Sequence, residues 1–499
     1  MGNHRRLLIS ILLLLLPLII YSNTIFSRFG FRDDYSILRE TSEEPGKIIK
    51  LCASHARPIY GWMLETFFSR MDEIDDLWVA RALGALCIGG LSILIYLALI
   101  RMRWDSVWSG LFAAMMAMLP AAQVDVSWAI CWPHVVAGML GAAGFLVSDR
   151  GGIARRIGGV ILVMAGTLIY QPNALFYVVP VAAGLFTYRH EPIRWRIRWL
   201  IGHIVVVGAS LASAFLLVQG LYAAGLIHLH KLVTIETEVL SKLDYYVHKP
   251  LLNALALFVL NDMREGWSLI YGLFAAAVSL TILAGGWGEF RRGGCREGVF
   301  WAGSLFVLFL VSSAPVLIAA QRWPTYRTIY PLTGVCLIFL ALGLQHLNDF
   351  FSRKTAWLVP AAFASMLTIA VPLASWHAYT LFALPQQQEL ALIEEGVKRM
   401  KPVYPCTVLV IRPDQEDSPA PAFYSDEFGT LSTNSDWTPK EMLKLVLREK
   451  FPSIRDRLKR FNVVCGHRLP LKPKYNVIID MRQMRASKDQ ATADGFLLF

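Results

Sequence analysis

Eleven apolar runs, most of them about as long as a bilayer is thick, constrain the fold of this chain more than any other feature. A spanning helix needs about 20 consecutive, mainly apolar residues. The runs lie near 7–22, 77–100, 106–121, 127–147, 157–170, 174–188, 199–223, 267–285, 299–320, 328–347 and 356–382. Hydrophobic residues make up 55% of the 499 positions and charged residues only 17%. We therefore predict an α-helical polytopic membrane protein with about 11 transmembrane helices, and exclude a soluble enzyme, a disordered chain and a coiled coil.

Basic residues recur as short clusters in alternate loops between the apolar runs. The clusters are Arg5/Arg6, Arg101/Arg103, Arg150/Arg155/Arg156, Arg189/Arg194/Arg196/Arg198, Arg291/Arg292/Arg296 and Arg353/Lys354. By the positive-inside rule, this pattern places the N-terminus in the cytoplasm and the tail outside. The net charge of +11 is spread over these loops, so nucleic acid is not an expected partner. The first run has the basic start of a signal peptide, but residues 21–24 lack an A-x-A-like cleavage site, so we expect an uncleaved helix.

Charge density divides the chain into two parts. Residues 384–499 hold 33 of the 85 charged residues, about twice the density of the rest. We predict a transmembrane domain over 1–383, with long outer loops at 23–75 and 224–265, and a soluble extracytoplasmic domain over 384–499. Helices near 387–400 and 439–458 and strands near 406–411 and 475–481 predict a small α/β unit. Cys406 and Cys465 are open to two interpretations, a disulfide or two free thiols.

The sharpest polar feature is the pair Asp33-Asp34, which follows the first apolar run within FRDDYSILRE. Ionisable residues are scarce inside the apolar runs and collect at their outer ends, a pattern that favours a catalytic cavity over a proton-coupled transporter. A carboxylate here could take a proton from a sugar hydroxyl as general base. In an extended segment the two side chains would point opposite ways, so one would face the reacting group and the other would orient the loop. The alternative is a solvated or helix-capping pair.

Arginines near the same ends would suit a phosphate. Arginine pairs with phosphate oxygens in a bidentate manner, so Arg39, Arg57, Arg322 and Arg327 are candidates for holding a lipid phosphate or diphosphate. Snorkelling of Arg322 and Arg327 to lipid headgroups is the competing interpretation.

The remaining candidates would line the cavity. They are Tyr35, His134, Gln171 and Tyr326. Because only the Asp pair offers hard oxygen ligands, we assign no metal site, although a divalent ion such as Mg or Mn remains open. The seven cysteines show no ligand-like spacing that would indicate zinc.

The order of these features resembles the GT-C superfamily of membrane glycosyltransferases, which use polyprenyl-phosphate-linked sugars. FRDDYSILRE, the later ARPIY, TLIYQPN and an arginine-bearing last outer turn, QRWPTYRT, look most like the bacterial O-antigen glucosyltransferases. The resemblance covers roughly residues 1–380. It implies that Asp33 or Asp34 is the catalytic carboxylate, that Arg57, Arg322 and Arg327 hold the donor phosphate, and that Gln171 lines the cavity.

The resemblance also implies a function at the outer face of a bacterial inner membrane, on the periplasmic side. The expected reaction moves a hexose, by resemblance glucose, from a polyprenyl-phosphate donor to a cell-envelope glycan or glycolipid such as lipopolysaccharide. A flippase or exporter of lipid-linked saccharides, or a polysaccharide polymerase, remains an alternative, since arginines would suit those as well.

Overall fold

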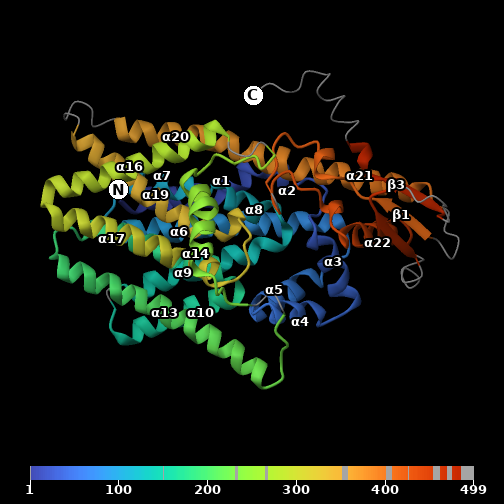
Figure 1. Cartoon of the computed structure of the whole chain (residues 1–499), viewed down its shortest axis with the longest axis horizontal. Coiled ribbons are helices and arrows are strands. Elements are labelled where there is room, and N and C mark those ends of the chain that lie inside the picture. Colours follow the sequence, from blue (N-terminus) through green and yellow to red (C-terminus); the bar gives the residue numbers. More distant parts are fainter. Residues whose placement is uncertain are drawn as a thin grey trace.

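The computed structural model describes residues 2–149, 151–230, 234–264, 268–350, 358–400, 407–424, 426–452, 461–468 and 475–484. Long helices lie roughly alongside one another and a smaller part of the chain, built mainly from the tail, caps one end of them (Figure 1). The predicted mostly helical architecture with a small sheet is therefore confirmed.

Seven helical segments within the described residues are long and apolar enough to cross a membrane, and one bent pair would make eight. They are Ile74–Arg101 with α6 (Leu77–Arg101), Ala129–Ser148 with α9 (Trp132–Ser148), α13 (Ile193–Ala223), α16 (Leu269–Gly293), α17 (Cys295–Ser312), Tyr330–Leu347 within α19 (Tyr330–Phe350), and Ala361–Lys398. The bent pair is α7 (Ser106–Met116) and α8 (Pro120–Ser127), with an angle of 57° between them.

Three further runs of the predicted eleven form shorter or broken helices. They are α1 (Gly2–Ile20), α10 (Ile153–Ile169), and α12 (Val178–Thr187), which α11 (Gln171–Ala174) precedes. The helix breaks after α10 at Tyr170, whose backbone is extended, and Pro172 occupies the first turn of α11, where a missing N–H is harmless. The count of eleven spans remains a prediction.

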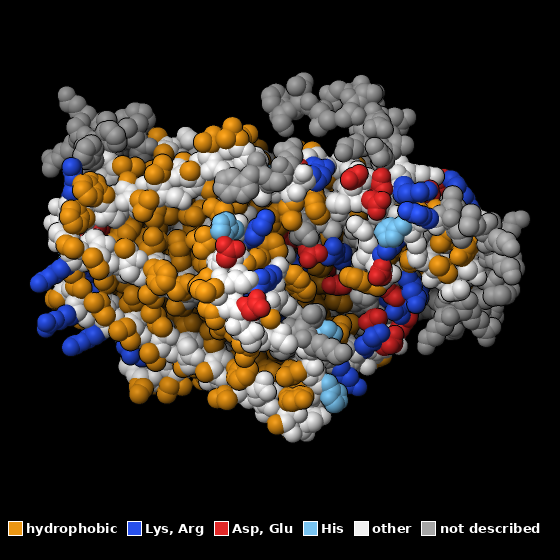
Figure 2. Space-filling model, in the orientation of Figure 1, with side chains coloured by type: hydrophobic (Ala, Val, Ile, Leu, Met, Phe, Trp, Pro, Cys, Tyr) orange, Lys and Arg blue, Asp and Glu red, His pale blue; other side chains and the backbone are white. Residues whose placement is uncertain are grey.

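The two ends of the helical part differ in charge. Lys and Arg side chains project from one end, acidic and basic side chains mix at the other, and hydrophobic side chains cover much of the surface between them (Figure 2). We call these the basic end and the polar end. The positive-inside rule would place the basic end in the cytoplasm.

The first long loop folds into three short helices at the polar end. They are α3 (Asp33–Glu43), α4 (Lys47–Ser54) and α5 (Pro58–Phe68), after the short α2 (Ser22–Ile25) that follows α1. Pro58 occupies the first turn of α5, where a missing N–H is harmless. The second long loop contains α14 (Val239–Tyr246) and α15 (Leu252–Leu255), and α18 (Ala314–Ile318) precedes the last turn.

The tail continues directly from the last helix. α20 (Leu358–Trp376) passes through a π-helical segment, His377–Ala383, into α21 (Leu384–Lys398), so the predicted boundary at 383/384 lies inside a continuous helix. α22 (Thr438–Lys450) and strands β1 (Thr407–Ile411), β2 (Asn462–Gly466) and β3 (Val477–Asp480) complete it. The strands are parallel in the order β2-β1-β3, and Val408 of β1 pairs with Val463 and Val477. Cys465 is a free thiol, and Cys406 lies outside the described residues.

Ion pairs join the tail to the first long loop. Arg28 contacts Glu394 of α21 and Glu449 of α22, and Arg39 of α3 contacts Glu441 of α22. Because α21 is continuous with a spanning helix, the tail holds the first loop against the polar end of the helices.

Candidate active site

Turns at the polar end bring polar side chains together from distant parts of the sequence. They come from the start of α3, from α8 and α9, from the 3₁₀ turn Tyr326–Thr328, and from tail residues 426–437. The guanidinium of Arg327 acts electrostatically on Asp33, Asp125 and His134, so these groups share one cluster.

Asp33 and Asp34 are the first two residues of helix α3, so the expectation of an extended segment was wrong. The two carboxylates nonetheless diverge. Asp34 is fully buried, and its two oxygens accept the backbone N–H groups of Phe31 at 2.8 Å and Ile130 at 3.1 Å. Burial raises the pKa of Asp34 to about 7. Because both oxygens already bind backbone groups, Asp34 joins the first loop to the start of α9 and is poorly placed to meet a substrate.

Asp33 faces the cluster instead. Burial raises the pKa of its carboxyl above the usual value, while Arg32, Arg327 and a side-chain hydrogen bond with Trp437 favour the ionised form. Arg32, just before it, has φ 44°, a left-handed conformation that a residue with a side chain rarely adopts. Arg32 also forms an ion pair with Asp426 of the tail. Strained backbone of this kind collects at functional sites, and here it directs the start of α3.

A carboxylate of the tail binds the backbone of Arg327. Glu427 is fully buried, and its carboxylate accepts the backbone N–H groups of Tyr326 at 2.7 Å and Arg327 at 3.1 Å. Burial raises the pKa of Glu427 to about 7, against the opposing effect of the nearby Arg327 charge. The Arg327 guanidinium stacks 4.5 Å from the centre of the Trp128 ring, and its buried Nη1 has no hydrogen-bond partner among the described residues. A buried cationic donor without a partner is suited to receiving an anion.

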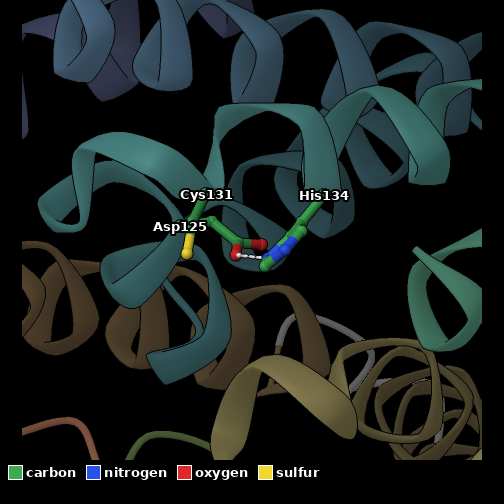
Figure 3. A group of neighbouring side chains, drawn as sticks. All are labelled: Asp125, Cys131 and His134. Atoms are coloured by element: carbon green, nitrogen blue, oxygen red, sulfur yellow. Dashed lines mark ion pairs between the residues drawn. The ribbon is translucent and has the colours of Figure 1, made fainter. Parts of the chain in front are cut away.

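Asp125, Cys131 and His134 form one group of neighbouring side chains (Figure 3), and the charge of Arg327 acts on all three. His134 Nδ1 is 3.5 Å from Asp125 Oδ1, and the other oxygen of Asp125 accepts from the side-chain amide of Asn173 at 3.3 Å. Neither ring nitrogen of His134 has a hydrogen-bond partner within the described part of the chain, nor does Asp125 Oδ1. Unpaired polar atoms this deeply buried are costly, which marks the cluster as a place for a bound polar group.

The same three side chains could hold a metal ion. Their ligand atoms lie within 4.8 Å of one another and offer one oxygen, one sulfur and one nitrogen. That mixed set suits zinc, whereas Mg and Mn prefer oxygen ligands. The charge of Arg327 nearby opposes a cation there. If zinc binds, Asp125, Cys131 and His134 would hold it, and it would supply a Lewis acid beside Asp33 and Arg327.

Arg57 and Gln171 meet on the other side of His134. Arg57 Nε donates to Gln171 Oε1 at 3.2 Å, and its guanidinium lies 4.8 Å from the centre of the Tyr170 ring. Tyr170 in turn stacks on His134, with ring centroids 3.7 Å apart. Arg57 and Gln171 therefore border the cluster around Arg327, and the donor-phosphate role of Arg57 and the cavity role of Gln171 stay predictions.

Two of the four predicted phosphate-binding arginines are engaged elsewhere. Arg39 is buried among carboxylates and pairs with Glu43 of its own helix and Glu441 of the tail. Arg322 is exposed and pairs with Glu236 of the second long loop. Their positions favour structural roles, because their charges are already balanced by acids from neighbouring segments.

Tyr35 and Tyr326 are buried packing residues in this structure. The Tyr35 hydroxyl accepts from the backbone N–H of Gly30 at 3.1 Å. The Tyr326 hydroxyl accepts from the N–H of Asn261 at 3.4 Å, and its ring packs 4.5 Å from that of Tyr424. Both shape the walls behind the cluster.

Sequence reasoning missed the contribution of the tail. Asp426, Glu427 and Trp437 all reach the cluster, although they lie about 400 residues from Asp33 in the sequence. The available signal was the acidic pair in FYSDEFG, which aromatic residues flank as they flank the pair in FRDDY. Asp125 and Cys131 belong to no recognisable motif, because Asp125 stands alone in the short turn between the runs 106–121 and 127–147 and Cys131 is a single residue within an apolar run.

Comparison with known proteins yields weak structural similarity alone. No family model matches the sequence, and no curated protein matches it. The fold is similar to the Archaeoglobus fulgidus oligosaccharyltransferase in complex with Zn and sulfate (14% identity, 93% of this chain and 62% of that one, TM-score 0.42). It is also similar to the oligosaccharyltransferase AglB of the same organism with an inhibitory peptide and a dolichol-phosphate (13%, 88% and 63%, TM-score 0.42). The chain spans less than two thirds of those proteins, and TM-scores this low say nothing further about its activity.

The arrangement itself defines the chemistry that is available. A carboxylate that can accept a proton, a guanidinium with an unused donor and a second arginine border one buried polar cluster. Such a set can remove a proton from a hydroxyl group while stabilising negative charge that develops on a leaving group.

Proposed function

We propose that this protein is a membrane-embedded glycosyltransferase that moves a hexose from a polyprenyl-phosphate donor to a glycan or glycolipid of the cell envelope. The observation that carries the proposal is the shared cluster of Asp33 and Arg327, with an unpartnered Nη1, at the polar end of spanning helices. The positive-inside rule would place this end outside the cytoplasm of a bacterial inner membrane. Nucleotide sugars are absent there, so a donor must be tethered to lipid.

Asp33 is the general base in this proposal. Its carboxylate takes the proton from the acceptor hydroxyl, whose oxygen then forms a bond to the anomeric carbon of the donor sugar. The bond between that carbon and the phosphate oxygen breaks, and polyprenyl phosphate leaves with the bonding electrons. The proton that Asp33 accepted passes to solvent when the product departs.

Arg327 and Arg57 bind the phosphate in this scheme. No described residue accepts a hydrogen bond from Nη1 of Arg327, so a phosphate oxygen could bind there without displacing one of them. Arg57 Nε already donates to Gln171, which leaves its terminal nitrogens for the same phosphate or for the sugar. A guanidinium stabilises the leaving phosphate more strongly as negative charge grows on it. Because this stabilisation is larger in the transition state than in the bound substrate, it accelerates the reaction.

The proposal narrows the predicted catalytic pair to one residue. Asp34 is assigned to positioning, because both of its oxygens bind backbone N–H groups. Arg39 and Arg322 are likewise left out of donor binding, since acidic side chains neutralise them.

The test is sugar transfer by the purified full-length protein with a panel of polyprenyl-phosphate sugars and envelope glycolipids. Asp33→Asn should abolish release of polyprenyl phosphate while the protein still folds and inserts. Asp244→Asn, an exposed aspartate of the second long loop, is the matched control and should retain full activity. Wild-type activity in the Asp33→Asn variant would refute the assignment. Movement of intact lipid-linked saccharide across vesicles, with no new glycosidic bond, would favour the flippase instead.

A further inference from the structure

A second polar cavity lies at the basic end of the helices, with a volume of about 500 Å³. It is formed where α9 ends, α10 begins and α13 begins. Its lining includes Arg156, Arg198, Tyr188, Trp195, Trp199 and His203.

This cavity is distinct from the candidate active site. α9 runs from His134 in the polar cluster to Ser148 in the cavity wall, and α10 runs from Arg156 in that wall towards Tyr170. Fourteen residues of helix at 1.5 Å each separate the two ends of these helices by roughly 20 Å. The two sites therefore face opposite ends of the helical part.

The cavity has the charge of an anion site. Among the described residues, two arginines and one carboxylate, that of Glu191, line it. The Arg156 guanidinium lies over Gly202, at ordinary van der Waals distance from where a side-chain carbon would stand. Neither Arg156 nor Arg198 forms an ion pair within the described ranges.

A buried donor without an acceptor supports the same interpretation. The indole Nε1 of Trp199 is buried, and no described residue accepts its hydrogen. The neighbouring imidazole of His203 is fixed by a 2.6 Å hydrogen bond between its Nδ1 and the hydroxyl of Tyr177, which also bonds to Ser148 at 2.8 Å. An acceptor atom from a ligand would complete the set at Trp199.

The surroundings indicate a lipid rather than a soluble anion. α10 and α13 pack against each other, and both expose aliphatic side chains beside the cavity: Ile157 and Ile161 on α10, and Ile197, Ile201 and Val205 on α13. Trp195 and Tyr188 are of the residue types that concentrate at the level of lipid headgroups. A basic pocket between spanning helices, continued by an exposed apolar face, fits a phosphate headgroup and its acyl chains.

We propose that this cavity binds the headgroup phosphate of an anionic glycerophospholipid from the leaflet at the basic end. Arg156 and Arg198 neutralise the phosphate, the Trp199 N–H donates to one of its oxygens, and the acyl chains lie along α10 and α13. The site is independent of the proposed glycosyl transfer, because it lies at the other end of these helices.

Native mass spectrometry of the full-length protein in detergent tests this, with phosphatidylglycerol and phosphatidylcholine of identical acyl chains. The wild type should retain phosphatidylglycerol preferentially, and R156Q/R198Q should bind it about 30-fold more weakly. The matched control is R155Q/R194Q, which removes two exposed arginines of the same helices outside the cavity lining and should bind like the wild type.

Trp199→Phe removes the N–H donor together with part of the indole and keeps both arginines, so it tests the site even if the double variant folds poorly. It should weaken phosphatidylglycerol binding about tenfold. Equal binding of the two lipids, or equal losses in the two double variants, would overturn the proposal. Displacement of bound lipid by an equal concentration of inorganic phosphate would identify a soluble-anion site and would also overturn it.

Discussion

Replacing Arg327 with glutamine tests the proposed mechanism most directly, because it should change two measurable quantities at once. The substitution removes the guanidinium that stacks on Trp128 and whose Nη1 has no partner among the described residues. If this group stabilises the leaving phosphate, its loss should lower kcat by about 10²–10³-fold, the usual effect of deleting one preorganised donor.

The second quantity is the pH dependence. Burial raises the pKa of Asp33 above the usual value. Arg327 is one of two arginines that act against this by favouring the ionised form. A base must be ionised to act, so activity falls as pH drops through that pKa. Without Arg327 the pKa of Asp33 rises further, and the acid limb of the kcat/KM profile should move to higher pH.

This variant should lose some stability. The lost contact with Trp128 is a cation–π interaction worth about 0.5–2 kcal/mol, and Asp33 and Glu427 lose a nearby charge that favours their ionised forms. Thermal unfolding and detergent gel filtration therefore check that the variant is folded before its kcat is compared.

The assay follows release of polyprenyl phosphate from pH 5 to 9. Arg322→Gln is the control, because Arg322 lies in the same turn but is exposed and pairs with Glu236. A kcat within threefold of wild type, or an unmoved acid limb, would refute the role of Arg327.

Three further predictions follow from the polar contacts. Burial disfavours the ionised form of Asp33, so its raised pKa contributes stability at low pH that is lost as the pH rises. Asp33→Asn should therefore be inactive but should unfold at a temperature equal to or above that of the wild type at neutral pH. A lower unfolding temperature would contradict this. Asp34→Asn should lose about 1–3 kcal/mol of stability, measured by denaturation, because an amide cannot accept both backbone N–H groups; unchanged stability would show that these bonds contribute little. Arg39→Met should cost at most about 3–5 kcal/mol, because Glu441 then keeps only its contact with Lys444, yet the folded fraction should keep its transfer rate; a lost rate at full stability would return Arg39 to the donor site.

The local parts of the fold were readable from the sequence. Apolar runs predicted the long helices, and the strand β1 lies where the residue pattern indicated it. These patterns depend on residues only a few positions apart, so they can be recognised without the fold.

The different roles of Asp33 and Asp34 could not be predicted from the sequence. Nothing in FRDDYSILRE distinguishes Asp33 from Asp34. The difference arises because the N–H of Ile130, 96 residues further on, lies beside Asp34, whereas Asp33 faces Arg327. The sequence likewise does not distinguish Arg39 from Arg327 as a phosphate ligand. The structure does, because Arg39 forms an ion pair with Glu441.

The sequence by itself determined a helical membrane protein with a charged tail and polar groups at the ends of its helices, because the cost of placing charge in lipid acts on each segment separately. Only the tertiary structure decided which of those polar groups meet. Glu427 and Trp437 reach Asp33 and Arg327 because the last spanning helix continues into the tail and carries it over the first loop. Contacts between residues hundreds of positions apart depend on packing, and short-range patterns do not encode it.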